Sequence, residues 1–123
     1  MKLQLLESDL AVIRRAATDP IPEWVWSSRF YSITRTDEEL SIFCEARVVP
    51  LNESGNSGWR AMRVVGTLDF SLIGIISSLT MPLAAKQISV FSISTHDTDY
   101  LVVREDRLDD AVDVLRRAGH QFI

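Results

Sequence analysis

The chain has 123 residues, of which 46% are hydrophobic and 24% charged, as expected for one globular domain or two very small units that share a core. Its 13 Lys and Arg against 17 Asp and Glu give a net charge of −4, and the basic residues are scattered singly or in pairs. Nucleic-acid binding needs a concentrated basic footprint, so this composition argues against that class of function.

The first half of the chain, residues 1–58, predicts mainly strands. Strand patterns occur in four places: residues 2–6, 10–17, 29–35 and 41–49. A proline-punctuated loop over residues 19–23 and a turn over residues 36–40 separate them. Residues 50–58, rich in Gly, Asn, Ser and Pro, predict an open surface loop that also marks a candidate boundary between two halves.

The single cysteine and three tryptophans are interpreted as packing residues. Cys44 is expected to fill a buried site in its strand, and a lone cysteine excludes an internal disulfide or a cysteine-based metal site. Trp24 and Trp26 would share one face of an extended chain, and with Trp59 they are expected in the core or between the halves. An aromatic platform for a ligand is the alternative.

The second half begins with a predicted strand over residues 59–66 and a helix over residues 70–85. Asp69 is expected to cap this helix, and Pro82 to kink it or end it early. Gly74 would lie inside the helix, at a cost of about 1 kcal/mol relative to Ala. The apolar face of the helix recurs at helical spacing: Leu72, Ile76, Leu79 and Leu83.

Two strands, residues 88–95 and 99–104, and a second helix, residues 107–118, follow. Asp106 is expected to cap this helix and Gly119 to stop it. Its buried stripe is Leu108, Ala111, Val112 and Leu115. With a last short strand at residues 121–123, the order βαββαβ predicts an α+β, ferredoxin-like unit over residues 59–123, whose helices cover one face of a four-stranded antiparallel sheet. Residues 1–58 are interpreted as a reduced companion subdomain.

The turn Ser94-Thr95-His96-Asp97-Thr98-Asp99 between the two middle strands is unusually polar. The Asp99 side chain should share a face with Leu101 and Val103, because successive strand residues alternate. A carboxylate at the edge of an apolar layer needs partners, and a cationic group of a ligand would provide a strong one. The alternative is that Asp99 accepts hydrogen bonds from backbone N–H groups of its own turn.

The start of the first helix of this unit is the second part of the candidate site. Gly74 lacks a Cβ, which permits close approach either of a ligand or of the sheet to the helix. Unpaired N–H groups in the first helical turn attract anions. An amino-acid carboxylate there and its cationic group at Asp97 or Asp99 would make a bipolar site, with neutral hydrogen bonds from Ser94 and Thr95. The candidate ligand-binding residues are therefore Leu72, Ile73, Gly74, Ile75, Ser94, Thr95, Asp97 and Asp99.

Catalytic and metal chemistry have little support. His96 and Asp97 are adjacent and should point to opposite faces of an extended chain. A turn could bend them together, but no Ser or Cys nucleophile in a recognisable setting accompanies them. His120 follows the predicted helix stop and is expected on the surface. Two distant histidines lack metal-ligand spacing, so neither metal nor cofactor is expected. The amino-terminal residues lack a signal-peptide pattern and no apolar span reaches membrane-helix length, so a soluble, cytoplasmic protein is expected.

Two stretches of the chain resemble the ACT-domain proteins, in the branch that includes the CASTOR arginine sensors. They are FYSITRTDEELSI, residues 30–42, and GTLDFSLIGIISSLTMPLAAKQISVFSISTHDTDYLVVREDRLDDAVDVLRRAGH, residues 66–120. The resemblance implies a non-catalytic regulatory module that binds a small molecule, typically an amino acid, at an interface between ACT units. It places the ligand near Ile73, Gly74 and Ile75, with Asp99 in the position of an acid that contacts it.

The resemblance also bears on assembly. The chain has one clear unit and one reduced unit, so a complete site would need a homodimer, and any signal would pass through an unidentified protein partner. Arginine-like and small neutral amino acids both fit the site. A ligand-free structural or protein-interaction dimer is the rival interpretation, and an acid–base enzyme is a third.

Overall fold

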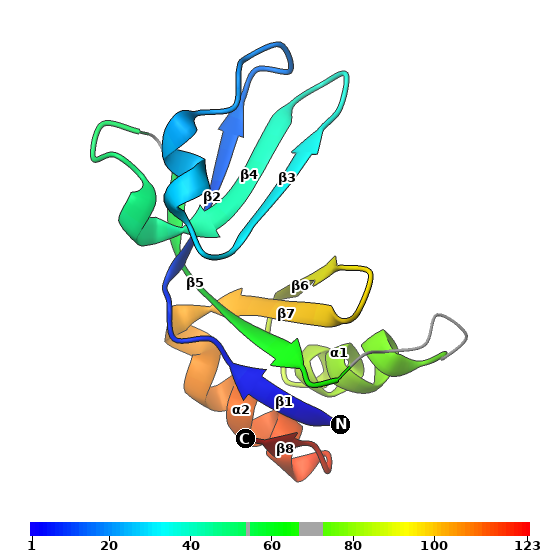
Figure 1. Ribbon diagram of the computed structural model, residues 1–123. Coiled ribbons are helices and arrows are strands. Elements are labelled where there is room, and N and C mark those ends of the chain that lie inside the picture. Colours follow the sequence, from blue (N-terminus) through cyan, green and yellow to red (C-terminus); the bar gives the residue numbers. More distant parts are fainter. Residues whose placement is uncertain (54, 67–72) are drawn as a thin grey trace. The chain divides into compact units, whose positions relative to one another are not determined.

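The computed structural model describes residues 1–53, 55–66 and 73–123 (Figure 1). Within these ranges the chain forms two compact units. We call Met1–Glu7 with Arg60–Ile123 the flanking unit and Ser8–Trp59 the inserted unit. The predicted halves, residues 1–58 and 59–123, differ from these units mainly in residues 1–7, which group with the C-terminal part of the chain.

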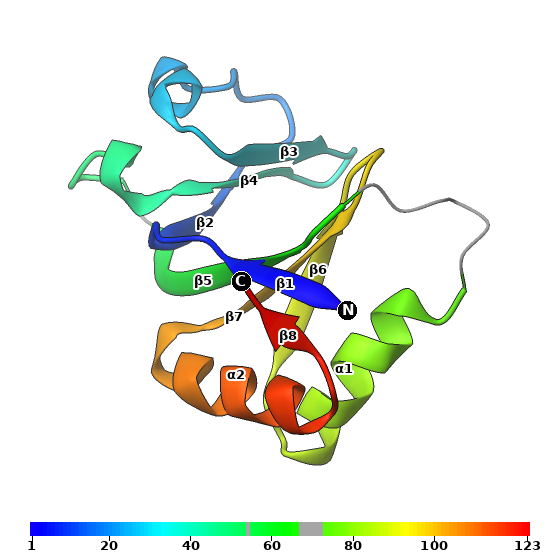
Figure 2. The same cartoon turned by 60° about the horizontal axis from the view of Figure 1, so that its bottom comes forward.

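The flanking unit is a sheet with two helices on one face (Figure 2). Its elements are β1 (Lys2–Leu5), β5 (Asn56–Val64), α1 (Ile75–Ala85), β6 (Val90–Ser94), β7 (Asp99–Arg104), η3 (Glu105–Arg107), α2 (Leu108–Arg117) and β8 (Gln121–Phe122). The strand order is β6-β7-β5-β1-β8. The predicted α+β, ferredoxin-like architecture is therefore confirmed.

The predicted four-stranded antiparallel sheet is wrong in one respect: β1 lies between β5 and β8. It pairs antiparallel with β5, where Leu3 faces Val64, and parallel with β8, where Leu3 faces Phe122. Leu3 is fully buried in the core under the helices. This burial explains why the first strand belongs to the sheet of the flanking unit, since leaving it out would expose apolar surface on both of its neighbours.

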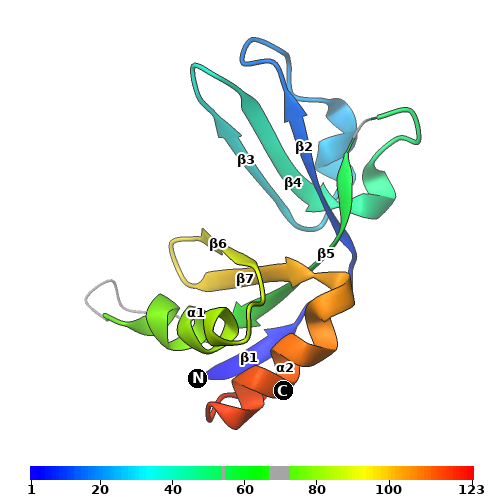
Figure 3. The same ribbon diagram turned by 180° about the vertical axis from the view of Figure 1, so that it is seen from behind.

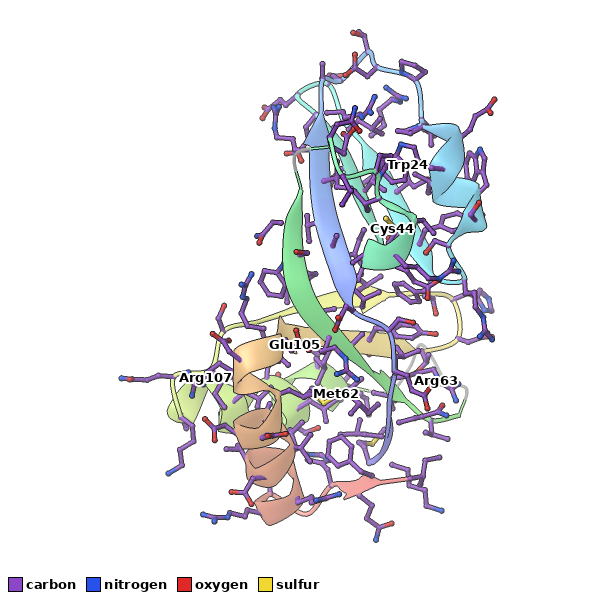
Figure 4. All side chains as sticks on the ribbon, turned by 90° about the vertical axis from the view of Figure 1, so that its left-hand side faces the viewer. Trp24, Cys44, Met62, Arg63, Glu105 and Arg107 are labelled. Carbon is purple, nitrogen blue, oxygen red and sulfur yellow. The ribbon has the colours of Figure 1, made fainter. Side chains whose placement is uncertain are left out.

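Alternation along the strands separates the core from the other face of this sheet. Met62 is fully buried, whereas the neighbouring Arg63 donates a hydrogen bond to Gln4 at an exposed position (Figure 4). The core cluster comprises Leu3, Met62, Val64, Leu79, Leu83, Ile88, Leu101, Val103, Leu108, Ala111 and Leu115. The cluster contains most of the apolar faces predicted for the two helices. The exceptions are Ile76 and Val112, which are partly buried, and Leu72, which lies outside the described residues.

Helix α1 begins later than predicted. Gly74 has a φ of +78° and precedes the first helical residue, so it does not lie inside the helix. Only glycine adopts this conformation without a steric cost, which explains the residue at this position. Pro82 lies inside the helix, and the helix continues to Ala85, so the predicted early end is wrong. The predicted cap, Asp69, and Leu72 lie outside the described residues.

The ends of α2 differ from the predictions in two ways. Asp106 lies in η3, and the N-cap position belongs to Arg107, which makes no side-chain capping bond. His120 is buried, not on the surface: its Nδ1 lies 3.0 Å from the Met1 amino group and its Nε2 lies 3.1 Å from the Ser78 carbonyl oxygen. Gly119, with a φ of +98°, ends the helix and turns the chain back toward β1, which brings the imidazole inside.

The inserted unit is a second small sheet with two short 3-10 helices. Its elements are β2 (Leu10–Arg15), η1 (Glu23–Ser27), β3 (Tyr31–Arg35), β4 (Leu40–Glu45), η2 (Ala46–Val48) and the first residues of β5. The strand order is β3-β4-β2-β5, with antiparallel pairs. Residues 56–58 belong to β5, so the predicted open loop over residues 50–58 is shorter than expected.

Cys44 lies in the core of the inserted unit, as predicted. It is fully buried with Ile13, Val25 and Ile42, and Trp24 packs against this cluster (Figure 4). Trp24 and Trp26 both lie in η1, so the extended chain on which they would share a face does not form there. Trp26 is 53% exposed and forms an edge-to-face contact with Tyr31, with 5.3 Å between ring centroids.

Neither α-helix in the described part of the chain has the length and hydropathy needed to cross a membrane.

Candidate ligand-binding site

The polar turn of the flanking unit is held against the end of β5. The Thr95 N–H donates to the Thr98 carbonyl oxygen at 2.8 Å and closes the turn. The Thr98 hydroxyl, which is buried, donates to the Val64 carbonyl oxygen at 2.6 Å. The turn is therefore fixed at the end of the sheet where β5 stops, and the start of α1 lies at this same end (Figures 1 and 3).

Asp99 opens β7, as predicted, and Ser94 lies directly opposite it at the end of β6. The Ser94 hydroxyl donates to Asp99 Oδ1 at 2.6 Å, so the contact differs from the backbone alternative considered from the sequence. Asp99 is half-buried, and Leu101 on the same side of the strand is fully buried in the core. Among the described residues, Asp99 Oδ2 has no hydrogen-bond partner, so one oxygen of a positioned carboxylate is available to a cation.

His96 and Asp97 are in contact, as the sequence allowed for a turn but not for an extended chain. His96 Nδ1 lies 2.9 Å from Asp97 Oδ1 because the tight turn brings the two side chains together, whereas an extended chain would separate them. The side chains are 85% and 67% exposed, respectively. Such exposure lowers the strength of the pair, and it leaves the pair without the enclosed setting in which a dyad acts on a substrate.

The start of α1 presents backbone donors without a side-chain cap. The first helical hydrogen bond is donated by the Ser78 N–H to the Gly74 carbonyl oxygen at 2.9 Å. The N–H groups of residues 75–77 precede this bond, so they have no partner within the helix. A Cβ on Gly74 would meet no atom within 4 Å among the described residues, so the glycine serves its positive φ and not a close approach. Ile73 is 93% exposed.

The structure thus brings together some of the predicted site residues. Ser94 and Asp99 are in contact, whereas Thr95 uses its hydroxyl within the turn, donating to the Thr98 carbonyl oxygen at 3.1 Å. Leu72 lies outside the described residues. The sequence reasoning missed Thr98, which joins the turn to β5. The signal in the sequence is a threonine in a turn next to the start of a strand, where its hydroxyl can donate to a backbone carbonyl oxygen.

A second polar cluster surrounds Glu45, which is 3% exposed in the inserted unit. Its carboxylate accepts hydrogen bonds from the Ser8 hydroxyl at 2.7 Å, the Arg29 N–H at 2.5 Å and Arg47 Nη2 at 3.0 Å. Burial raises the pKa of this carboxyl, but the bonds from Ser8, Arg29 and Arg47 outweigh burial and lower it to about 2. The cluster joins three segments of the unit and was not predicted.

Cys44 is chemically protected by its surroundings. Burial, with the adjacent Glu45 carboxylate, raises the pKa of its thiol to about 11. The thiolate, which is the reactive form, is therefore scarce at neutral pH, as expected for a packing residue. Within residues 1–53, 55–66 and 73–123, no group of three His, Cys, Asp or Glu side chains is placed to hold a metal ion.

Comparison with known proteins identifies the family. A family model described as an ACT domain matches residues 54–117, just over half of the chain. The chain belongs to the ACT-domain family. A second model, which describes an N-terminal domain, matches residues 9–52 and so falls within the inserted unit.

Relatives of this ACT protein include the human cytosolic arginine sensor for mTORC1 subunit 1, which is 31% identical over 110 residues. That match covers 83% of this chain but 32% of the sensor, so the chain spans about a third of the length of the curated relatives it matches.

Solved structures agree with the family assignment. A crystal structure of a protein from Agobacterium tumefaciens superimposes with a TM-score of 0.92 at 37% identity, covering 99% of this chain and 91% of that one. The regulatory subunit of aspartate kinase from Thermus thermophilus has a TM-score of 0.61 at 8% identity, covering 94% and 93%. At that identity, the second likeness concerns the fold alone.

Proposed function

We propose that this ACT protein is a non-catalytic, cytoplasmic regulatory module that binds an amino acid. The observation that carries the proposal is the Asp99 carboxylate, which Ser94 holds through Oδ1 while Oδ2 remains available, at the same end of the unit as the uncapped start of α1. The likeness to a protein named as an arginine sensor supports an amino acid as the ligand class.

The two parts of the site suit the two charges of an amino acid. Backbone N–H groups at the start of α1 are donors for a carboxylate, and the positive end of the helix dipole favours a negative charge there. Asp99 accepts from the ammonium or guanidinium group, and a charge-assisted bond of this kind is stronger than a neutral one. Asp97 is a weaker acceptor because His96 already occupies its Oδ1.

The quaternary part of the proposal is a homodimer whose sites lie where ACT units meet. Because both predicted parts of the site lie toward solvent in the described residues, a second copy would enclose the ligand and exclude water. An excluded-water site strengthens every charged contact within it. Ligand binding would then change how the dimer engages a protein partner, which fits a regulatory module without chemistry of its own.

Thermal denaturation with each of the twenty amino acids tests the proposal. A ligand that binds only the folded state raises the midpoint temperature by mass action, and about 2.7 kcal/mol is gained at a hundredfold excess over Kd. Asp99→Asn should lower the affinity of the responding amino acid at least about tenfold, because it removes the charge while preserving the shape. Asp109→Asn, at an exposed position on α2, is the matched control.

The outcomes separate the candidate functions. No shift with any amino acid at millimolar concentration favours the ligand-free scaffold and contradicts the proposal. A shift that Asp99→Asn leaves unchanged removes Asp99 from the site but retains the function.

A further inference from the structure

His120 lies where three elements of the flanking unit meet, and its backbone ends helix α2. The His120 N–H donates to the Leu115 carbonyl oxygen at 3.0 Å. The Gly119 N–H donates to the Arg116 carbonyl oxygen, also at 3.0 Å. These two bonds form a Schellman motif, in which a glycine of positive φ ends the helix. The motif fixes the backbone of His120 and therefore gives the imidazole a defined direction.

The two ring nitrogens of His120 have different partners. Nε2 lies 3.1 Å from the Ser78 carbonyl oxygen, and because this oxygen can only accept, Nε2 carries the proton. Nδ1 lies 3.0 Å from the Met1 amino group and is therefore the acceptor of that contact. The partners thus assign the neutral tautomer of a buried imidazole, with its proton on Nε2.

The Ser78 carbonyl oxygen lacks its usual helical donor. In an α-helix it would accept from the N–H four residues later, but that residue is Pro82, which has no N–H. An interior proline usually kinks or ends a helix, whereas α1 continues through Pro82 to Ala85. The Nε2–H of His120 lies where it can replace the missing donor. The proline of one helix and the histidine that follows the other are therefore complementary.

This contact acts on the first turn of α1. Ser78 donates its N–H to the Gly74 carbonyl oxygen at 2.9 Å and its hydroxyl to the Ile75 carbonyl oxygen at 2.8 Å. It directly follows residues 75–77, whose N–H groups are the proposed donors to a ligand carboxylate. The polar turn with Asp99 lies at the same end of the unit (Figures 1 and 3). A bond to the Ser78 carbonyl therefore holds the part of the helix that would receive the ligand.

We propose that His120 is a positioning residue of the candidate ligand site, and that its Nε2–H substitutes for the helical donor that Pro82 lacks. The inference rests on the proposed function and deepens it, because it names what keeps the backbone donors of α1 in place. His120 acts through the helix and does not touch the ligand. Without its bond the first turn of α1 opens part of the time, and the affinity of the ligand falls with the fraction of ordered turn.

A packing role for His120 predicts a different result. If the ring only filled space, its loss would cost the same whichever residue stood at position 82. If the ring replaces a missing donor, Pro82→Ala returns an N–H to the Ser78 carbonyl and makes the bond from His120 dispensable. The two positions together therefore distinguish a hydrogen-bonding role from a packing role.

A double-mutant cycle tests the pair without ligand. His120→Leu should raise the unfolding equilibrium constant about a hundredfold in circular-dichroism urea titrations, because the Ser78 carbonyl and the Met1 amino group both lose the ring. In the Pro82→Ala chain the same change should cost about tenfold, which is a coupling of about tenfold. His96→Leu, at a histidine that is 85% exposed, is the control and should change the constant less than about threefold.

Two further measurements separate positioning from stability. The ¹⁵N signals of the two imidazoles report the tautomer, and His120 should carry its proton on Nε2 in the folded chain. Thermal denaturation with each of the twenty amino acids is repeated on the variants. His120→Leu should weaken binding of the responding amino acid about fivefold to tenfold, and the double variant should bind within about twofold of Pro82→Ala.

Each result decides the inference. Additive effects of His120→Leu and Pro82→Ala overturn it, as does a proton on Nδ1. Should His120→Leu alone fail to fold, folding of the double variant supports the pair and its failure overturns the pair. Coupling in stability with unchanged ligand affinity overturns the positioning role. A wild-type chain that responds to none of the twenty amino acids contradicts the proposed function and the positioning role, whereas the cycle alone decides whether His120 compensates for Pro82.

Discussion

The environment of Glu45 allows a quantitative prediction about the stability of the inserted unit. Its carboxyl has a pKa of about 2 in the folded chain, compared with 4.5 for the group without this environment. Each pKa unit corresponds to 1.36 kcal/mol, so the ionised carboxylate contributes at most about 3 kcal/mol to the free energy of unfolding. Arg47, one of the partners, is 57% exposed, and solvent screening reduces its share. We therefore expect the ionised carboxylate to contribute about 2 kcal/mol.

The sign of the pH dependence follows from the lowered pKa. A carboxyl that binds its proton less tightly in the folded state stabilises that state above the unfolded pKa, and the stabilisation is lost as pH falls toward the folded pKa. The wild-type chain should therefore lose about 2 kcal/mol between pH 5 and pH 2 from this group. Glu45→Gln should lose a similar amount already at pH 7 and show a flatter dependence at acid pH.

Urea denaturation followed by tryptophan fluorescence measures this effect. Trp24, Trp26 and Trp59 all lie in the inserted unit, so the signal reports on that unit. Glu38→Gln, at an exposed position of the same unit, is the control and should change the free energy of unfolding by less than about 0.5 kcal/mol. A Glu45→Gln loss below that value at pH 7, or a pH dependence equal to that of the wild type, would refute the reasoning.

Two further predictions concern the flanking unit. Thr98→Val keeps the side-chain shape but leaves the Val64 carbonyl oxygen without its donor, so it should lower the free energy of unfolding by about 1–2 kcal/mol in circular-dichroism urea titrations. Thr34→Val on the exposed side of β3 should cost far less, and equal losses would contradict a special role for Thr98. Gly74→Ala should cost about 1 kcal/mol because of the positive φ, and Gly74→Asn less, since Asn tolerates this conformation better. Equal stability of Gly74→Ala and the wild type would exclude this account.

Local patterns in the sequence predict much of the fold. Residues 99–104 alternate and become β7, and the apolar spacing of Leu108, Ala111 and Leu115 marks the buried side of α2. The hairpin around Asp99 is also predictable, because a polar turn between two apolar strands is a short-range signal. These features depend on residues only a few positions apart, where backbone preference and hydrophobic period act directly.

The candidate site is only partly predictable. The positions of Ser94 and Asp99 follow from the hairpin register, so their proximity is inherent in the pattern. The Ser94 hydroxyl as the partner of Asp99, and the contact of His96 with Asp97, depend on the detailed path of the turn. The assignment of these residues to a ligand stays a prediction, as does the interpretation of residues 1–58 as a reduced ACT-like subdomain.

Sequence alone determined the βαββαβ order, the polar turn and the ACT resemblance, because each is encoded in contiguous residues. Tertiary structure decided the rest. It places β1 between β5 and β8, buries His120 and gives Gly74 its left-handed conformation before α1. It also lowers the pKa of Glu45 by gathering donors from three segments. Strand pairing, burial and electrostatic environment depend on residues far apart in the chain, so no local pattern specifies them.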